Sequence, residues 1–196
     1  MEVQLKQITG NWNRGWALHK HTLSSVYIGD NEFGRAQFDT KRSEVGEAVF
    51  QLKYRSDWSQ AALLAAQIKS SIVPFLGKVG LIIPMCASTP RARQPVTEVA
   101  KALGELIDVP VFEDILTRLP PSEGDVPLKN INNKADKVSA LKGKLSFKDS
   151  ITNQGCWNAL LLDDLFDTGA SMEAACAALR TYPKINEIYA VALTWK

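Results

Sequence analysis

The sequence has few cysteines, no long apolar run and almost no net charge. Its three cysteines, Cys86, Cys156 and Cys176, are odd in number and far apart. This pattern argues against a disulfide framework or a four-cysteine zinc site, and favours a reducing compartment. No apolar stretch approaches the roughly 18 residues of a membrane helix, and the first residues lack the apolar centre of a signal peptide. We therefore expect a soluble cytoplasmic protein with no membrane partner.

The charge balance argues against nucleic acid as the main partner. The chain has 23 basic and 21 acidic residues, a net charge of +2, and such a balance creates no strong field toward a polyanion. Of its 196 residues, 45% are hydrophobic and 22% are charged, as in ordinary globular proteins. A chain of this size buries about 70% of its extended surface, enough for one sizeable core.

From about residue 48 onward, apolar patterns alternate between strand and helix. Strands are predicted at 79–85, 109–112, 144–147, 158–164 and 187–195, and helices at 61–72, 95–107, 134–143 and after residue 171. Residues 48–54 fit either a strand or the start of a helix. The alternation predicts an α/β fold with a twisted, mainly parallel sheet flanked by helices.

Residues 1–47 differ from the rest, because they carry aromatic side chains between turn signals. We expect β-hairpins here, in a β-rich N-terminal segment separate from a core at 48–196. Trp12, Trp16, Tyr27 and Phe38 are expected to form the small core of this segment or to stack on a ligand. His19 and His21 would share one strand face, but no third metal ligand is evident nearby, which favours a structural role.

The segment Asn158–Ser171 carries the most chemistry. A strongly apolar run ends in Asp163 and Asp164, and a turn from Asp167 to Ser171 then leads into a helix. Ligands of open α/β sheets bind at the carboxyl ends of strands, and glycine with successive N–H groups at a helix start makes an anion site. Two acidic acceptors beside a phosphate site suit a ribose 5-phosphate.

This segment resembles the 5-phosphoribosyl diphosphate (PRPP) signature of type I phosphoribosyltransferases. The stretch Leu52–Arg55 and the run IIPMCASTPRAR further resemble the ComF-like branch of that family, over roughly residues 48–196. Two departures are the absence of cysteine from residues 1–47, where those relatives carry a zinc ribbon, and the residues Arg93–Val96 in place of an Arg-Gly-Phe-Asn stretch. The resemblance implies the type I phosphoribosyltransferase fold, with residues 1–47 as the hood segment, the variable region that selects the acceptor.

The resemblance also implies site residues and a cofactor. Asp163 and Asp164 would hold the ribose hydroxyls, directly or through water bound to Mg²⁺. Asp167 is a candidate general acid or base, the alternative being an acid that complements the helix dipole. The 5-phosphate would be bound by Asp167, Thr168, Gly169, Ala170 and Ser171, and the diphosphate by the loop residues Ala87, Ser88, Thr89 and Arg91. A buried structural role is favoured for Cys86.

Two further segments have both a functional and a structural interpretation. The loop 118–133, with Pro120, Pro121 and Gly124, would be a lid over PRPP or an ordinary surface loop. Residues 129–148 hold six lysines against one acid, Asp136, which would gather a polyanion or simply form a solvated face.

The leading functional hypothesis is a Mg²⁺-dependent phosphoribosyltransferase that releases diphosphate from PRPP and acts on an unidentified nitrogenous acceptor, such as a nucleobase. The alternatives are a PRPP or nucleotide sensor without turnover, and a ComF-like adaptor in DNA handling. A homodimer is usual among the relatives that the sequence resembles, so self-association of this chain is an open expectation.

Overall fold

The computed structural model describes residues 1–87, 91–120, 131 and 133–196. Its helices are α1 (Glu44–Tyr54), α2 (Ser59–Ser71), α3 (Pro95–Ile107), α4 (Lys134–Leu141) and α5 (Ala170–Leu179), with a 3₁₀ turn at Val73–Phe75. Its strands are β1 (Lys6–Gln7), β2 (Arg14–Lys20), β3 (Thr22–Asp30), β4 (Ala36–Arg42), β5 (Leu81–Pro84), β6 (Leu116–Arg118), β7 (Leu145–Phe147), β8 (Trp157–Phe166) and β9 (Ile185–Trp195). Within these residues no helix is long and apolar enough to cross a bilayer.

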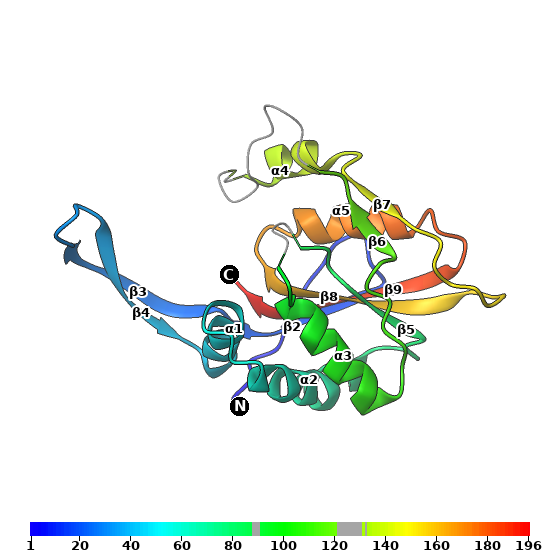
Figure 1. The fold of residues 1–196 in the computed structure, drawn as a ribbon, viewed down its shortest axis with the longest axis horizontal. Coiled ribbons are helices and arrows are strands. Elements are labelled where there is room, and N and C mark those ends of the chain that lie inside the picture. The colour runs from blue at the N-terminus through cyan, green and yellow to red at the C-terminus, as the bar shows by residue number, and fades with distance from the viewer. Residues whose placement is uncertain (88–90, 121–130, 132) are drawn as a thin grey trace.

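A five-stranded sheet forms the centre of the molecule, in the order β1-β2-β9-β8-β5. Strands β2, β9, β8 and β5 run parallel, and only the short edge strand β1 is antiparallel. The mainly parallel α/β sheet expected from the sequence is therefore present. Because the four long strands share one direction, their carboxyl ends meet at one edge of the sheet (Figure 1).

Both faces of the sheet are buried, which explains why β8 reads as an unbroken apolar run. Ala159 and Leu161 of β8 join the core beneath α5, whereas Leu160 and Leu162 join the core beneath α1, α2 and α3. Successive strand residues point to opposite faces, so each apolar residue of β8 has a helix to cover it. Figure 1 shows α5 on one side of the sheet and α1–α3 on the other.

Residues 48–54, which fit either a strand or a helix from sequence, belong to helix α1. Ser43 caps this helix, because its Oγ accepts a hydrogen bond from the Gly46 N–H at 2.9 Å. Glu44 and Glu47 in the first turn and Lys53 in the last turn complement the helix dipole. The capping residues therefore favour a helix where apolar periodicity alone allowed either a strand or a helix. Lys53 lies in the last turn of this helix, at the end nearest the acidic pair.

Two predicted strands lie outside the main sheet's ladder. Residues 109–112 make one parallel bridge, between Val111 and Ile82, and no strand of their own. Pro110 has no N–H to donate, although its carbonyl accepts from the Ile82 N–H at 2.9 Å. Strand β7 pairs antiparallel with β6 in a separate two-stranded sheet. Most of the expected lid, 121–130 and residue 132, lies outside the described residues.

The N-terminal segment is divided between two sheets. Strand β2 pairs in parallel with β9, from Arg14 opposite Tyr189 to Lys20 opposite Trp195, and so belongs to the main sheet. Residues 22–42 instead form an antiparallel hairpin, β3–β4, which extends away from the body (Figure 1). The β-hairpins expected in residues 1–47 are present, but β2 extends the core sheet because β9 offers it a full-length edge.

Candidate functional site

The acidic pair lies in the last part of β8, near the carboxyl edge of the sheet. Asp163 stands opposite Ala192 of β9 in the register, and its Oδ1 accepts a hydrogen bond from the Asp164 N–H at 2.8 Å. Because neighbouring strand residues point to opposite faces, the two carboxyl groups serve different sides of the site. Both are partly buried, so each carries a desolvation cost that its surroundings must offset.

Lys53 of α1 neutralises one of the two acids. Its Nζ donates a hydrogen bond to Asp164 Oδ2 and forms an ion pair with it. Burial by itself would lower the pKa of Lys53, but the charge and hydrogen bond of Asp164 outweigh burial and leave that pKa raised. The Lys53 ammonium is therefore a fixed positive charge at the floor of the site.

Asp163 forms no such ion pair among the described residues. Burial, reinforced by the charge of Asp164, raises the pKa of Asp163 to about 8. Lys53 thus pairs with Asp164, whereas the surroundings of Asp163 favour its protonated form. A carboxyl group that keeps its proton can donate a hydrogen bond as well as accept one, so Asp163 suits a hydroxyl group of a ligand.

The turn between β8 and α5 forms the second part of the site. Gly169 adopts a left-handed conformation, with φ of 80°, and precedes the first turn of α5. A Cβ at this position would lie 3.0 Å from Cε2 of Phe166, so both the backbone and the packing require glycine. The first N–H groups of a helix have no intrahelical acceptors, and together with the hydroxyls of Thr168 and Ser171 they can bind an anion.

Lys137 of α4 lies over this turn. Its Nζ donates to Asp167 Oδ2 at 2.7 Å, and Lys196 Nζ lies 4.0 Å from Asp167 Oδ1. Lys137 also lines the cavity of about 180 Å³ formed by the residues of the turn. Asp167 therefore stands in an ion pair, and Lys137 adds a positive charge where an anion would bind.

The loop after β5 borders the other side of the acidic pair. Arg91 Nη1 donates to the Lys53 carbonyl at 2.8 Å, which ties the loop to the end of α1. Ala87 lines the same cavity as Arg91, whereas the predicted residues Ser88 and Thr89 lie outside the described residues. Arg93 turns away, because it pairs with Glu98 and stacks on Trp58 at 4.1 Å.

Two cavities meet at Asp163. The larger, about 460 Å³, is lined by the acidic pair, the β5 loop and the end of α1, and it shares Asp163, Leu165 and Ser171 with the cavity over the turn. The fold thus brings together residues that lie more than a hundred positions apart in sequence, from Lys53 to Ser171.

Cys86 and Arg118 also line the larger cavity. Burial raises the pKa of the Cys86 thiol, while the nearby Arg118 acts in the opposite direction. The Nε of Arg118 is buried without a hydrogen-bond partner among the described residues. Cys86 is thus a protonated wall residue, and Arg118 presents a positive charge to the cavity.

Three site residues were not identified from the sequence. From the sequence, Lys53 belongs only to a resembling segment, Lys137 is only one of six lysines, and Arg118 is only the first residue of the predicted lid 118–133. A local excess of lysine was the one available signal. None of the three follows a motif, because each reaches the site from a different element through the tertiary fold.

The aromatic residues and histidines of the N-terminal segment lie in different parts of the structure and do not form one cluster with Tyr27 and Phe38 of the hairpin. Trp12 is buried and meets Phe166 edge-on at 6.2 Å, and Trp16 packs on Phe75 at 5.2 Å. His21 lies beside Thr194, with Nδ1 to Oγ1 at 3.2 Å, and burial lowers its pKa. In the part of the chain that the structure describes, no group of three or more His, Cys, Asp or Glu side chains could hold a metal by itself.

Replacing Lys53 is expected to destabilise the protein. In Lys53→Met, the partly buried Asp164 carboxylate loses its counter-charge, at a cost of about 1–3 kcal/mol, which chemical unfolding with urea would measure. Lys148→Met is a matched control, because the Lys148–Asp114 pair at 2.8 Å is exposed at both ends and worth at most about 1 kcal/mol. Equal losses in the two variants would contradict the importance of the Lys53 pair.

The stability of the wild type is expected to depend on pH through Asp163. Its raised pKa in the folded state means that the unfolded chain releases this proton at lower pH, so stability falls from about pH 4 to about pH 8. Asp163→Asn removes this pH-dependent loss of stability. It is expected to raise the Tm by about 3–8 °C near pH 8 and to change it little near pH 4. A Tm difference that is independent of pH would contradict the raised pKa.

Comparison with known proteins gives a uniform but distant result. No protein-family model matches the sequence, and no curated protein matches it. Among solved structures, the chain is similar to adenine phosphoribosyltransferase from Leishmania tarentolae, with a TM-score of 0.44 and 10% identity over 98% of this chain and 95% of that one. It is also similar to hypoxanthine phosphoribosyltransferase from Staphylococcus aureus, with a TM-score of 0.41 and 11% identity over 71% and 65% of the two chains.

A third similar structure is UMP synthase from Leishmania donovani, with a TM-score of 0.41 and 14% identity. The match covers 88% of this chain but only 29% of that longer protein. Similarity at this level identifies neither the reaction nor the acceptor of this chain. Both are therefore inferred from the site itself.

Proposed function

We propose that the protein binds PRPP and transfers its phosphoribosyl group to a nitrogenous acceptor, with release of diphosphate. The observation that supports this most strongly is the meeting of two cavities at Asp163. On one side lies an anion-binding helix start, and on the other lie an acidic pair and three cationic side chains, Lys53, Arg91 and Arg118. A ribose with a phosphate at one end and a diphosphate at the other matches this distribution of charge.

In this proposal each part of the ligand has its own residues. Asp163 and Asp164 receive the ribose hydroxyls, and the turn from Asp167 to Ser171, with Lys137 above it, receives the 5-phosphate. The diphosphate lies toward Ala87 and Arg91, in the larger cavity with Lys53 and Arg118. The predicted contacts of Ser88 and Thr89 fall on residues outside the described part of the chain.

The acidic pair also fits the proposed Mg²⁺ ion. Magnesium in phosphate-binding sites usually takes one or two carboxylates and completes its shell with water and substrate oxygens, so Asp163 and Asp164 would hold it through bound water. Once bound, the ion would offset negative charge on the leaving diphosphate. Lys53 already neutralises Asp164 and would keep that carboxylate oriented toward the ligand.

The chemistry proposed is displacement at the anomeric carbon. The bond from C1 to the diphosphate oxygen breaks, a bond from C1 to the acceptor nitrogen forms, and the acceptor's proton passes to Asp167 or to water. Lys53, Arg91 and Arg118 stabilise the charge that builds on the leaving group, and the helix start holds the phosphate so that C1 is correctly placed. The acceptor is proposed to be a nucleobase selected by the hood segment.

Calorimetric titration with PRPP, with and without Mg²⁺, tests the binding step, and diphosphate release in a screen of nucleobases tests transfer. Saturable binding of PRPP that Mg²⁺ strengthens is the expected result. Failure of PRPP to bind under either condition would reject the proposal at its first step.

A second candidate function, binding of PRPP without transfer, is favoured by one observation. Asp167, the candidate general base, is held in an ion pair with Lys137, so its Oδ2 already accepts a hydrogen bond from within the protein. If transfer occurs and Asp167 is its base, Asp167→Asn is expected to slow diphosphate release by about 10²–10⁴-fold while the Kd for PRPP changes little.

The same measurement has a control and a contrary outcome. Asp39→Asn, on the exposed hairpin, should leave both quantities unchanged. Wild-type protein that binds PRPP but releases no diphosphate with any nucleobase would support the sensor instead. A ComF-like role in DNA handling stays a prediction, tested by the salt dependence of oligonucleotide binding.

A further inference from the structure

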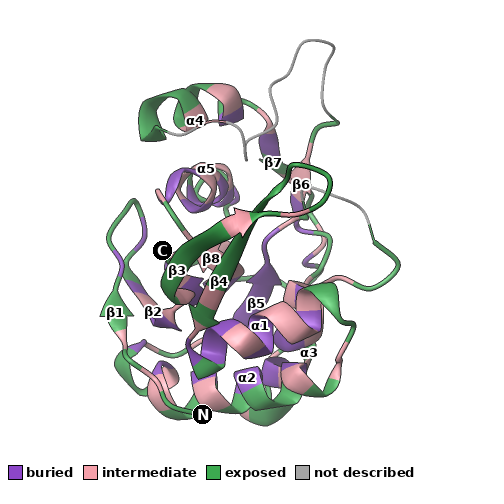
Figure 2. Ribbon diagram, turned by 90° about the vertical axis from the view of Figure 1, so that its left-hand side faces the viewer, coloured by how far each residue is buried: buried purple, intermediate pink, exposed green. Residues whose placement is uncertain are grey.

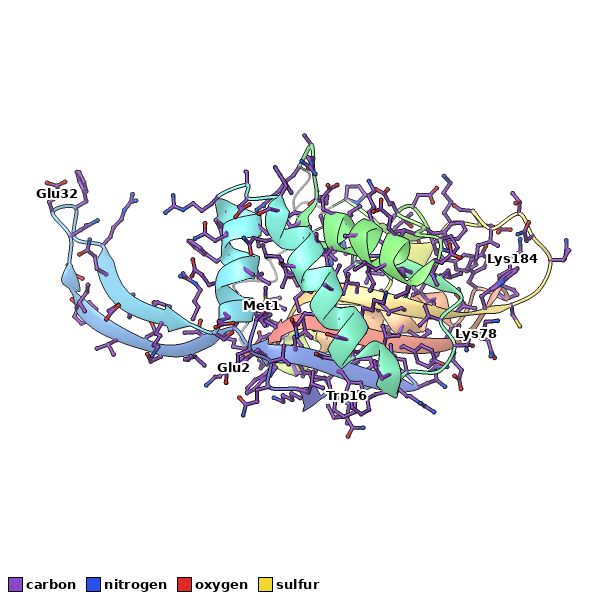
Figure 3. The ribbon with its side chains drawn as sticks, turned by 90° about the horizontal axis from the view of Figure 1, so that it is seen from below. Met1, Glu2, Trp16, Glu32, Lys78 and Lys184 are labelled. Atoms are coloured by element: carbon purple, nitrogen blue, oxygen red, sulfur yellow. The ribbon has the colours of Figure 1, made fainter. Side chains whose placement is uncertain are left out.

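The β3–β4 hairpin gathers several exposed large apolar side chains on one element, whereas those elsewhere in the described residues are scattered. Its six large apolar side chains, Leu23, Val26, Tyr27, Ile28, Phe33 and Phe38, are between 44% and 77% exposed. Figure 3 shows the hairpin extending from the body, with Glu32 at its far end, and Figure 2 shows most of its length exposed. Apolar side chains gathered on one projecting element indicate a surface that another molecule covers.

The hairpin also lacks the support that two strands normally need. No third strand pairs with β3 or β4 among the described residues, and an isolated two-stranded hairpin is only marginally stable in water. Its exposed apolar side chains amount to roughly 600 Å², if each large side chain contributes about 100 Å². Pairing along one edge would cover only the part of this surface beside that edge, and main-chain hydrogen bonds between the strands would supply the rest of the interaction.

The outer edge of β3 is open to strand pairing. Natural edge strands are usually protected by charged residues or proline, but β3 contains no proline or basic residue, and its one charge, Asp30, lies at its end. Strand β4 is different, because it carries Asp39, Lys41 and Arg42. Two register irregularities, near Leu23 and Ile28, leave Ser24–Tyr27 as the regular part of β3.

We propose that two copies of this chain associate through their hairpins, with β3 of one copy antiparallel to β3 of the other. Two identical strands that pair in this way are related by a two-fold axis, which we place at Val26, the midpoint of β3. Asp30 of one copy then lies opposite Thr22 of the other, so the like charges stay apart. The result is a four-stranded sheet in which the two open β3 edges pair their main-chain groups, and side chains near Val26 pack against each other across the axis.

The charge of the hairpin favours a second copy over a polyanion. Residues 22–42 hold three acids and three basic residues, with Arg42 at the hairpin's end, so the segment has no net charge to attract nucleic acid. The β3 edge itself carries one charge, Asp30 at its end, so a second copy meets it without repulsion. This association does not depend on the proposed PRPP chemistry and would be present in a protein with no transferase activity.

Pairing would also affect the neighbourhood of the site. The hairpin begins directly after β2, where His21 contacts Thr194, and the Thr194 hydroxyl donates to the Asp164 carbonyl at 2.8 Å. Association of the hairpins therefore fixes a segment that is two contacts away from the acidic pair.

Light scattering coupled to gel filtration tests the association. Wild-type protein is expected at twice the chain mass of 21.6 kDa. The Val26→Lys/Tyr27→Lys variant is expected at the single mass, because the new charge at position 26 would face its own copy across the axis and the one at position 27 would lie next to that pair. Leu63→Lys is the matched control, since Leu63 is an exposed leucine of α2, and it should remain dimeric. Circular dichroism checks that each variant is folded.

A cross-link tests the register. In a Cys156→Ser background, which removes the exposed cysteine, Val26→Cys places two thiols opposite each other with Cβ atoms about 4.5–5.5 Å apart, near the reach of a disulfide. Mild oxidation is expected to link most of the protein as dimers. A monomeric wild type, a dimer that survives the double lysine variant, or the absence of the cross-link would each overturn the proposed pairing.

Discussion

The double variant Asp163→Asn/Asp164→Asn is expected to lose PRPP binding, with an affinity at least 100-fold weaker than that of the wild type, or about 2.7 kcal/mol. Asparagine keeps the size of each side chain but replaces a carboxyl oxygen with an amide nitrogen, which cannot accept a hydrogen bond from a ribose hydroxyl or from water bound to the proposed Mg²⁺. It also leaves the Lys53 ammonium without its partner, which orients the cation less firmly in the cavity. Calorimetric titration with PRPP in the presence of Mg²⁺ measures the effect.

Asp108→Asn provides the control for this titration. Asp108 ends helix α3 in a left-handed conformation, with φ of 54°, which asparagine adopts readily. It stands at the opposite end of α3 from Pro95, which lines the cavity. Unchanged affinity in the double variant would show that PRPP binds elsewhere or that the acidic pair does not contact the ribose.

Gly169→Ala is expected to weaken PRPP binding by about 10–100-fold through the shape of the phosphate turn. The added Cβ would lie 3.0 and 3.2 Å from Phe166 ring atoms, and Phe166 is itself packed edge-on against Trp12. A non-glycine residue with positive φ adds about 1–3 kcal/mol of strain. The backbone N–H groups at the start of α5 would therefore shift away from the phosphate.

Gly34→Ala separates backbone strain from loss of the site. Gly34 also has a positive φ, 68°, but a Cβ there would meet nothing within 4 Å. We expect this variant to lose some stability and to bind PRPP normally. Similar PRPP affinities for the two alanine variants would mean that the turn at Gly169 does not hold the phosphate.

The alternation of elements and the strand, turn and helix start of Asn158–Ser171 were predictable from the sequence. A strand buried on both faces has an unbroken apolar run, as β8 does, and a glycine between acidic and hydroxyl residues at a helix start is typical of an anion site. Predictions for short segments were less reliable. Apolar periodicity does not describe the caps of α1, the missing N–H of Pro110 or the pairing of β7 with β6, although these features decided the structure of those segments.

By itself, the sequence determined the fold class and the two local parts of the candidate site, because an acidic pair and a helix start follow one another within a few residues. Only the tertiary structure decided which charges face them. Lys53, Arg118 and Lys137 come from three elements distant in sequence, and their approach depends on how α1, β6 and α4 pack around the sheet. The position of β2 in the main sheet was likewise decided by β9, because a strand joins whichever partner offers it a complete set of hydrogen bonds.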